Sequence, residues 1–340
     1  MQPQAATGQK RAEALLRADL QGGAVAHAYL LVGPSGVGRA ALARQLAAAL
    51  LCSRPGPEPC GACKSCRAFT SGNHPDYREA GVPEGKQELP IELIRSIQHQ
   101  SSLKPVLARR RVFVIRDAER MSLEAANCFL KTLEEPPGSA CFILIATTLW
   151  DMPQTVVSRC RLVRLSSLQP ERVQEELRAP DLCEDDAWWL ARRSWGSPGR
   201  ASAFRDTGLH QFNRQLAERL LAIRMEDNLA LTDWLSEATA QSAESRAEVR
   251  AALQELLECV AVFYRDLAAE AAAPGKAELF NRALRDQIAG LAARLPLDAI
   301  VACAEEALEA IDRLGANANW RLALDDLFTR LASAEPKRSR

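Results

Sequence analysis

Apolar residues in the first half of the chain come in short runs separated by longer stretches with helical spacing. The strand-like runs are His27–Val32, Arg111–Ile115 and Cys141–Thr147. Their apolar residues are adjacent rather than alternating with polar ones, which is typical of parallel strands that helices cover on both faces. The stretches Ala40–Leu51 and Leu123–Leu133 are rich in helix-forming residues. The pattern predicts an α/β domain with a parallel sheet over residues 1–165.

The strand-like runs end near Ser166, and the remaining pattern is helical. Residues 166–208 contain short helical stretches interrupted by glycine and proline, which predicts a small helical lid domain. Residues 209–334 are rich in Ala, Leu, Glu and Arg at helical spacing, which predicts an all-helical third domain. Residues 335–340 are expected to form a charged tail.

Composition narrows the class of protein. The chain has 340 residues, with 43 basic and 43 acidic side chains, so its formal net charge is zero. The net charge therefore gives no reason to expect strong independent binding to nucleic acid. No apolar run approaches the length of about 20 residues that spans a bilayer, and Met1–Lys10 lacks the character of a signal sequence. We therefore expect a cytoplasmic location, without a membrane partner and with reduced cysteines.

A glycine-rich segment follows the first strand-like run and precedes a helical stretch. The sequence Gly33-Pro34-Ser35-Gly36-Val37-Gly38-Arg39-Ala40 has the glycine spacing of a phosphate-binding loop. In the functional motif a lysine contacts the terminal phosphates and a hydroxyl holds magnesium, but Arg39 and Ala40 occupy these positions. We expect Gly33, Gly36, Gly38 and Arg39 to form a degenerate loop with weak nucleotide binding or none. A plain glycine-rich turn is the alternative.

The acidic motif expected after the second strand-like run is also incomplete. A magnesium-binding Asp followed by a catalytic Glu would come directly after Ile115, whereas the chain has Arg116 and Asp117. Shifting the alignment by one residue makes Asp117 the metal ligand and Ala118 the catalytic residue. Either alignment leaves the site incomplete, which favours a protein that does not hydrolyse ATP by itself.

Four of the ten cysteines are closely spaced. Cys52, Cys60, Cys63 and Cys66 lie within a segment rich in proline and glycine, at about residues 52–66. Four thiolates can give Zn²⁺ a closed tetrahedral shell with no open position for a substrate. We therefore expect a structural zinc site. An iron–sulfur cluster is the chemical alternative, and His74 is a competing ligand for which a turn without a metal role is the simpler interpretation.

Several segments together resemble one known family. They are His27-Ala28-Tyr29-Leu30, the stretch from Ala125 to Pro137 that contains Lys131-Thr132-Leu133-Glu134-Glu135-Pro136-Pro137, the triplet Ala146-Thr147-Thr148, and Ser158-Arg159-Cys160. Nearly end to end, the chain resembles the delta-prime family of bacterial DNA polymerase III clamp-loader subunits. This family consists of AAA+ proteins related to the ATP-hydrolysing gamma/tau subunit. The resemblance implies a AAA+ domain, a lid and a helical collar, and it favours zinc at the four cysteines.

The resemblance also implies roles for individual residues. Ser158-Arg159-Cys160 matches the motif whose arginine reaches the ATP site of a neighbouring subunit, so Arg159 is the expected arginine finger. By residue type alone, Arg161 and Arg164 are equal candidates, and a solvated or ion-paired arginine is the alternative. Thr147 or Thr148 matches the position called sensor 1. The sensor 2 arginine is replaced by Gly199, with Arg200 one place later.

Taken together, these features predict a non-hydrolysing delta-prime subunit that supplies Arg159 to an adjacent gamma/tau ATP site. The expected partners are the gamma/tau and delta subunits, with the sliding clamp and primer-template DNA contacted through the assembled complex. Two other functions remain open. One is an active ATPase of the gamma/tau type, and the other is a purely structural scaffold.

Overall fold

The computed structural model of the chain describes residues 8–83, 85–177, 182–224, 228–240, 246–315 and 319–334. They fall into two compact units. Of the described residues, those up to 176 and those of 194–201 form the first unit, and those of 177–193 and from 202 onward form the second. The three-domain division expected from the sequence stays a prediction, and its charged tail, residues 335–340, lies outside the described residues.

The first unit is built on a five-stranded parallel sheet with the order β2-β3-β4-β1-β5. Its strands are β1 (Ala28–Val32), β2 (Tyr77–Ala80), β3 (Arg111–Ile115), β4 (Ala140–Ala146) and β5 (Arg161–Arg164). Its helices are α1 (Lys10–Gln21), α2 (Arg39–Leu51), α3 (Lys64–Thr70), α4 (Ile91–Ser101), η1 (Ala118–Arg120), α5 (Leu123–Glu134), α6 (Gln154–Val157) and α7 (Pro170–Glu176).

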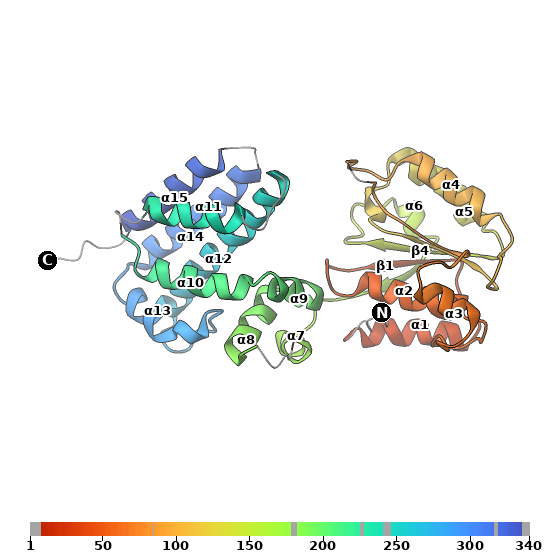
Figure 1. Cartoon of the computed structure of the whole chain (residues 1–340), viewed down its shortest axis with the longest axis horizontal. Helices are drawn as coiled ribbons and strands as arrows, with labels where there is room; N and C mark the ends of the chain where they lie inside the picture. The colour runs from red at the N-terminus through yellow and green to blue at the C-terminus, as the bar shows by residue number, and fades with distance from the viewer. Residues whose placement is uncertain are drawn as a thin grey trace. The chain divides into compact units, whose positions relative to one another are not determined.

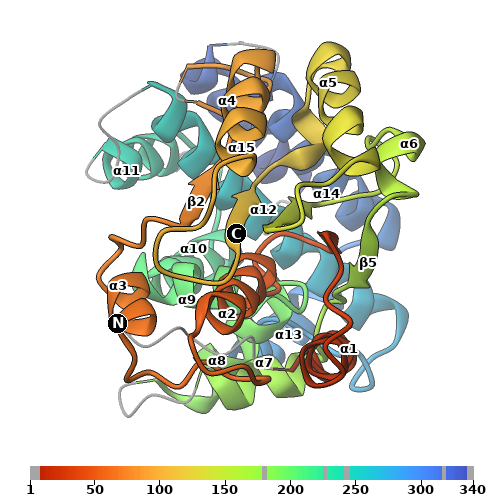
Figure 2. The ribbon, with the colours of Figure 1, turned by 90° about the vertical axis from the view of Figure 1, so that its right-hand side faces the viewer.

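Helices cover both faces of this sheet. Figures 1 and 2 show α4 and α5 on one side of the strands and α1 and α2 on the other. Along β1 the side chains alternate between these layers: Leu30 packs with the α4–α5 layer, and Tyr29 and Leu31 pack with the α1–α2 layer. The apolar strands are therefore buried on both faces, and the predicted α/β domain with a parallel sheet is confirmed.

The sequence analysis missed two strands. β2 and β5 are the outer strands of the sheet, each has four residues, and only Ala80 in β2 and Val163 in β5 are fully buried. Their sequences, YREA and RLVR, carry charged side chains because part of each strand faces solvent. An outer strand of this kind lacks the continuous apolar run by which the inner strands were recognised.

The second unit is helical. Its elements are α8 (Glu184–Arg193), α10 (Leu209–Leu221), α11 (Asn228–Ala240), α12 (Arg246–Ala272), η2 (Arg282–Leu284), α13 (Arg285–Ala292), α14 (Leu297–Gly315) and α15 (Trp320–Ala334), while α9 (Pro198–Asp206) runs from the first unit into the second. α12 packs against α14, which in turn packs against α15. The helical C-terminal part expected from the sequence is confirmed. Within the described ranges, no helix is both long and apolar enough to cross a bilayer.

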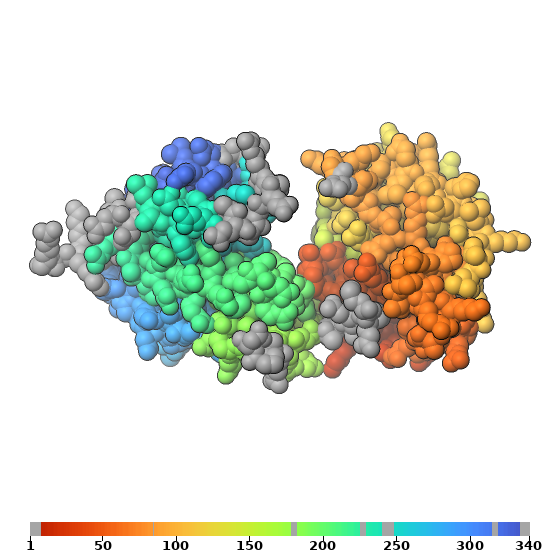
Figure 3. All heavy atoms as spheres, in the orientation of Figure 1, coloured from red at the N-terminus to blue at the C-terminus, as the bar shows by residue number. Residues whose placement is uncertain are grey.

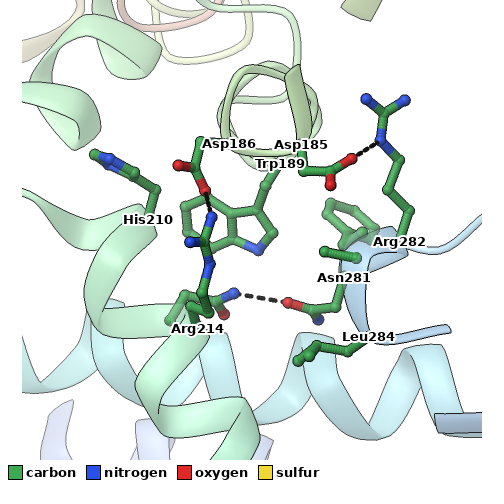
Figure 4. Close-up of a pocket in the computed structure, with 11 residues that line it drawn as sticks. Asp185, Asp186, Trp189, His210, Arg214, Asn281, Arg282 and Leu284 are labelled. Atoms are coloured by element: carbon green, nitrogen blue, oxygen red, sulfur yellow. Dashed lines mark hydrogen bonds and ion pairs between the residues drawn. The ribbon is translucent and has the colours of Figure 1, made fainter. Parts of the chain in front are cut away.

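A small cavity in the second unit lies between α8, α10 and the segment before α13 (Figure 4). Its volume is about 30 Å³, and Trp189 and Asn281 are among its lining residues. Two ion pairs border it, one from Arg214 to Asp186 and one from Arg282 to Asp185. Such a volume accommodates about one water molecule, so the cavity is too small for a nucleotide or another substrate.

Candidate functional site

The glycine-rich loop connects the end of β1 to the start of α2. Gly36 and Gly38 have φ angles of +76° and +98°, which lie in the left-handed region that side chains disfavour. Gly38 precedes the first residue of α2, Arg39, so the loop ends at a helix N-terminus. This is the backbone arrangement that places N–H groups toward an anion. The loop thus lies between a strand and a helix, as in a phosphate-binding loop, and its nucleotide binding stays a prediction.

The start of α9 packs directly on this loop. The backbone N–H of Gly199 donates to the carbonyl oxygen of Gly36 over 3.1 Å. A Cβ added to Gly36 would lie 2.1 Å from Ser197 Oγ, and one added to Gly199 would lie 3.0 Å from the Gly36 oxygen. Ser197 also accepts a hydrogen bond from the backbone N–H of Arg200, as a helix-capping serine does. The residue at the expected sensor 2 position is therefore a glycine in close backbone contact with the loop.

The cation of the loop lies near two carboxylates. Burial lowers the pKa of Arg39, and the charges of Glu119 and Asp117 oppose this effect. Glu119 accepts hydrogen bonds from both the backbone N–H, over 3.0 Å, and the side-chain hydroxyl of Thr147. Thr148 instead accepts from the backbone N–H of Trp150. Of the two expected sensor 1 candidates, only Thr147 is joined to an acidic side chain that interacts with the loop cation.

Arg116, which occupies the expected magnesium-ligand position, forms an ion pair with β2. Its Nε atom lies 3.2 Å from Oε1 of Glu79, and Oε2 of the same carboxylate lies 3.0 Å from Nη2 of Arg44 on α2. A guanidinium cannot coordinate a divalent cation, and this one shares the Glu79 carboxylate with Arg44. The arrangement agrees with the loss of a magnesium ligand at this position.

The expected arginine finger, Arg159, follows α6. Its Nη2 atom donates to Oε1 of Glu134 over 2.7 Å, and Nη1 donates to the carbonyl oxygen of Thr155 over 3.0 Å. The side chain is 35% exposed. Two sides of the guanidinium are thus held by α5 and α6, while a substantial part remains accessible to another molecule.

The two competing arginines have different surroundings. Arg161 forms an ion pair with the buried Asp19 of α1, so it joins β5 to that helix. Arg164 is exposed and makes no ion pair within the described part of the chain. Its position opposite Val32 in the sheet register places it at the end of β5 that lies beside the glycine-rich loop.

Arg159 and the glycine-rich loop lie at opposite ends of two adjacent strands, β5 and β1. β5 runs parallel to β1, with Arg161 opposite Tyr29 and Arg164 opposite Val32. The loop follows the carboxyl end of β1, whereas Arg159 precedes the amino end of β5. With about 3.3 Å per residue, the strands separate the two by roughly 15 Å. Arg159 is therefore too far away to act on a ligand in the loop of its own chain.

The four cysteines expected to hold a metal come together. Their Sγ atoms all lie within 4.8 Å of one another, and those of Cys60 and Cys66 are 4.0 Å apart. Cys52 ends α2, Cys63 caps the N-terminus of α3, and Cys66 lies in the first turn of α3. Figure 3 shows this part of the chain, in orange, at the surface of the first unit. Two helix ends and the loop between them therefore supply the four sulfur atoms.

This arrangement fits a zinc ion. Four Zn–S bonds of about 2.3 Å in a tetrahedron place the sulfur atoms about 3.8 Å apart, close to the spacing found. A hydrogen bond with Ser53 lowers the pKa of Cys63, whereas burial raises the pKa of Cys66. A bound cation would favour the thiolate form of all four ligands.

His74 supports the cysteine cluster from outside. It is buried, its Nε2 atom lies 2.6 Å from Ser65 Oγ, and its Nδ1 atom accepts from the backbone N–H of Asp76 over 3.0 Å. Burial lowers the pKa of His74, in agreement with a neutral ring that accepts at Nδ1. Both nitrogen atoms are therefore used in hydrogen bonds to protein groups, and the ring fixes the position of α3.

Sequence reasoning missed three contacts of the candidate site. Glu119 was not singled out because it lies four residues beyond β3, past the position where a motif places its acids. The contact of Ser197 and Gly199 with Gly36 joins residues about 160 positions apart. Glu134 was interpreted only as part of a helix end. No nearby sequence pattern indicates that Glu134 lies beside the Ser158-Arg159-Cys160 motif, because the two are 25 residues apart.

Comparisons with known proteins point to one family. A family model described as "DNA polymerase III, delta subunit" matches residues 8–169. A Pseudomonas aeruginosa protein named DNA polymerase III subunit delta' is 34% identical over 197 residues, which cover 57% of this chain and 60% of the relative. An Escherichia coli protein of the same name is 33% identical over 223 residues, or 65% of each chain. The chain thus spans about 60–65% of the length of these relatives.

A related subunit and a solved structure are also similar. The DNA polymerase III subunit tau/gamma of Haemophilus influenzae is 34% identical over 172 residues, covering 50% of this chain and 24% of the relative. The crystal structure of a gamma-subunit-related protein from Thermotoga maritima has 17% identity and a TM-score of 0.45, covering 96% of this chain and 99% of that one.

Proposed function

We propose that this chain, which is 32–34% identical to DNA polymerase III delta' subunits over 54–65% of its length, belongs to their family and works in a clamp loader without hydrolysing ATP itself. In this proposal Arg159 acts as an arginine finger in the ATP site of an adjacent gamma/tau subunit. A guanidinium in that position stabilises the charge that develops on the transferred phosphoryl group. Such a residue contributes in the complex, where a neighbour supplies the nucleotide and its magnesium.

One observation carries the proposal: Arg159 lies at the amino ends of the strands, whereas the loop of its own chain lies at their carboxyl ends. A phosphate contact by Arg159 therefore requires a nucleotide held by another protein. The side chain is partly exposed, and its contacts to Glu134 and Thr155 fix it from two sides. Partial fixation limits the conformational entropy that the side chain loses when it meets a phosphate.

The chain's own loop supports the same view. It lacks the magnesium-binding hydroxyl because residue 40 is alanine, and Arg116 is paired with Glu79 at the position of a metal ligand. Gly199 and Ser197 pack on Gly36 at the loop itself. These features favour a protein with weak nucleotide binding or none.

The remaining parts of the proposal follow from the family. The partners would be the gamma/tau and delta subunits, and the assembled complex would place a sliding clamp on primer-template DNA. The four clustered cysteines would hold a structural Zn²⁺ that joins α2 to α3. A cytoplasmic location belongs to the same proposal.

The direct test is ATP turnover by the complex reconstituted with clamp and primed DNA. Arg159→Ala should assemble normally and reduce turnover at the neighbouring site by about 10³-fold or more. Arg164→Ala is the matched control, because it removes an exposed arginine that forms no ion pair within the described residues. Equal turnover with wild-type chain and Arg159→Ala would rule out the finger and favour a purely structural role.

A second candidate, an active ATPase of the gamma/tau type, is favoured by the carboxylate of Glu119. This group interacts with Arg39 and accepts from Thr147, so an acidic side chain is present near the loop. The isolated wild-type chain distinguishes the two candidates. Turnover that disappears in Glu119→Gln would support an active site in this chain, whereas an inert chain supports the non-hydrolysing role.

A further inference from the structure

A larger cavity lies in the first unit, at the amino ends of β2 and β3. Its volume is about 400 Å³. We call it the edge pocket, and its lining includes Asp76, Arg78, Gln100, Arg111 and Phe113. Ligand pockets in proteins span about 300–1,000 Å³, so this one is large enough for a small organic molecule. It is separate from the glycine-rich loop, because β3 and β4 lie between β2 and β1 in the sheet.

Two arginines on neighbouring strands contribute to the edge pocket. Arg111 is the first residue of β3, and Arg78 of β2 is opposite Phe113 in the strand register. Since alternate residues of a strand share a face, both arginines lie on the same side of the sheet as Phe113, which packs with the α4–α5 layer. Gln100 lines the pocket from α4. Three elements therefore supply polar side chains to one cavity.

The protein neutralises only one of these arginines. Nε of Arg111 lies 3.5 Å from Oδ1 of Asp76, and the same guanidinium donates to the carbonyl oxygens of Gln100 and Pro75. Asp76 is 2% exposed, so its charge is directed at Arg111 and at backbone N–H groups. Arg78 forms no ion pair within the described part of the chain. The edge pocket thus keeps one uncompensated positive charge.

Arg78 is oriented by α4 and retains free hydrogen-bond donors. Its Nη1 atom donates to Oγ of Ser96 over 3.1 Å, while Nε and Nη2 have no partner among the described residues. A guanidinium carries five N–H donors, so most of those of Arg78 are unused. The side-chain amide of Gln100, four residues after Ser96 on the same helix, also makes no hydrogen bond within the described ranges.

We propose that the edge pocket binds a small organic phosphate, with Arg78 as its anchor. A phosphate monoester carries a charge of about −1.5 to −2 at neutral pH and three acceptor oxygens, which the fork of a guanidinium matches. Donors from a strand and from a helix suit this tetrahedral group better than a planar carboxylate. The volume of the cavity leaves room for the organic part of the ligand. This inference is independent of the proposed function.

Titration calorimetry of the full chain with inorganic phosphate, ribose 5-phosphate and glucose 6-phosphate tests the proposal. Ribose and citrate are the comparisons without phosphate. A sugar phosphate should bind at one site per chain and more tightly than inorganic phosphate. Arg78→Gln should weaken binding by at least about tenfold, because hydrogen bonds to a charged group are lost. Arg95→Gln, at an exposed arginine of α4 without an ion pair in the described ranges, is the matched control and should bind like wild type.

A second variant keeps the test independent of the fold of the edge strand. Gln100→Glu adds a negative charge to the cavity without changing the size of the side chain, so it should also weaken phosphate binding. Gln87→Glu, at an exposed position before α4, adds the same charge outside the cavity and should have no effect. Melting temperatures close to that of wild type show that each variant is folded.

The outcomes decide the proposal. Loss of sugar phosphate binding in both Arg78→Gln and Gln100→Glu, with both controls unaffected, supports the edge pocket as the site. The proposal is overturned if none of the phosphate compounds binds at millimolar concentration. It is also overturned if they bind Arg78→Gln as tightly as wild type, or if citrate binds in preference to all of them.

Discussion

Arg159 donates from Nη2 to Oε1 of Glu134 over 2.7 Å, so the proposed finger is held by the last residue of α5. Both side chains are partly exposed, at 35% and 50%. An ion pair of this kind contributes little to stability, but it restricts where the guanidinium points. Glu134 is therefore a positioning residue for Arg159 in the proposed mechanism.

Glu134→Ala should lower ATP turnover of the reconstituted complex by up to about fivefold, the size of an exposed ion pair. The loss should appear in kcat rather than in KM for ATP, because the neighbouring subunit binds the nucleotide. Glu135→Ala, one residue further along the chain and also exposed, should leave turnover unchanged. If both variants behave alike, or if Glu134→Ala changes only the melting temperature, the positioning role is excluded.

The packing of α9 on the glycine-rich loop predicts a difference between two glycines with the same backbone angle. Gly36 and Gly72 have φ angles of +76° and +77°, but a Cβ would meet Ser197 Oγ at 2.1 Å in the first case and no atom within 4 Å in the second. Gly72→Ala should cost about 1 kcal/mol for the backbone angle alone. Gly36→Ala should cost at least about 1 kcal/mol more, because Ser197 must also move.

Urea unfolding of the two variants measures this difference. Equal destabilisation would mean that the start of α9 does not rest on the loop. Ser197→Gly in the Gly36→Ala background is an informative addition, because it removes the hydroxyl that the new methyl group meets. Partial recovery of stability is the expected result.

Asp76 predicts a pH dependence of stability. Burial by itself would raise the pKa of Asp76, but hydrogen bonds from the backbone N–H groups of Ala108, Val106 and Leu107, together with one from Arg111, outweigh this effect and lower it. The ionised carboxylate therefore stabilises the folded state. This contribution is complete above the unfolded pKa of about 3.9 and is lost as the pH falls through the lower folded value.

Asp76→Asn should accordingly reduce the free energy of unfolding by about 1–3 kcal/mol at neutral pH, since one amide oxygen replaces a carboxylate that accepts several bonds. The difference from wild type should shrink below about pH 4 as Asp76 in the wild type becomes protonated. Asp151→Asn, at an exposed carboxylate, is the control and should change little at any pH. A difference that is constant from neutral to acidic pH would contradict the role assigned to the charge.

The cysteine cluster predicts one structural metal ion per chain. Protein purified without chelators should contain one equivalent of zinc and show no visible absorption, whereas an iron–sulfur cluster would be coloured. Cys66→Ser should lose the metal and lower the unfolding temperature of the first unit. Cys183→Ser, at an exposed cysteine outside the cluster, should retain the metal and the wild-type unfolding temperature. Iron and sulfide at the cluster, or full stability after removal of zinc, would overturn the assignment.

Much of the first unit was predictable because its signals are local. The runs Arg111–Ile115 and Cys141–Thr147 match β3 and β4 within one residue at each end, and Ala40–Leu51 matches α2 from its second residue. These inner strands are buried on both faces, so all their positions except Arg111 at the start of β3 are apolar. The outer strands β2 and β5 were not predicted, because their partly solvated faces allow charged residues that interrupt an apolar run.

The candidate functional residues also differ in how far local sequence predicts them. The glycine-rich loop and the four cysteines depend on spacing within a few residues, and the folded chain brings the cysteines together as expected. The alternatives among Arg159, Arg161 and Arg164 could not be resolved from residue type. Arg159 pairs with Glu134, Arg161 pairs with the buried Asp19, and Arg164 forms no ion pair within the described residues. These differences arise from the sheet and its neighbouring helices.

The sequence by itself determined the parallel α/β fold, the defects of the loop at Arg39 and Ala40, and the four-cysteine cluster, because each follows from periodicity or from short spacing. Tertiary structure alone decided that Arg159 lies at the end of the strands opposite its own loop, that Gly199 rests on Gly36, and that Leu297, Val301 and Leu308 of α14 stay exposed. These relationships join distant residues or depend on which helix face the core uses. Strand order and helix packing fix them, and neither is encoded in the local pattern of residues.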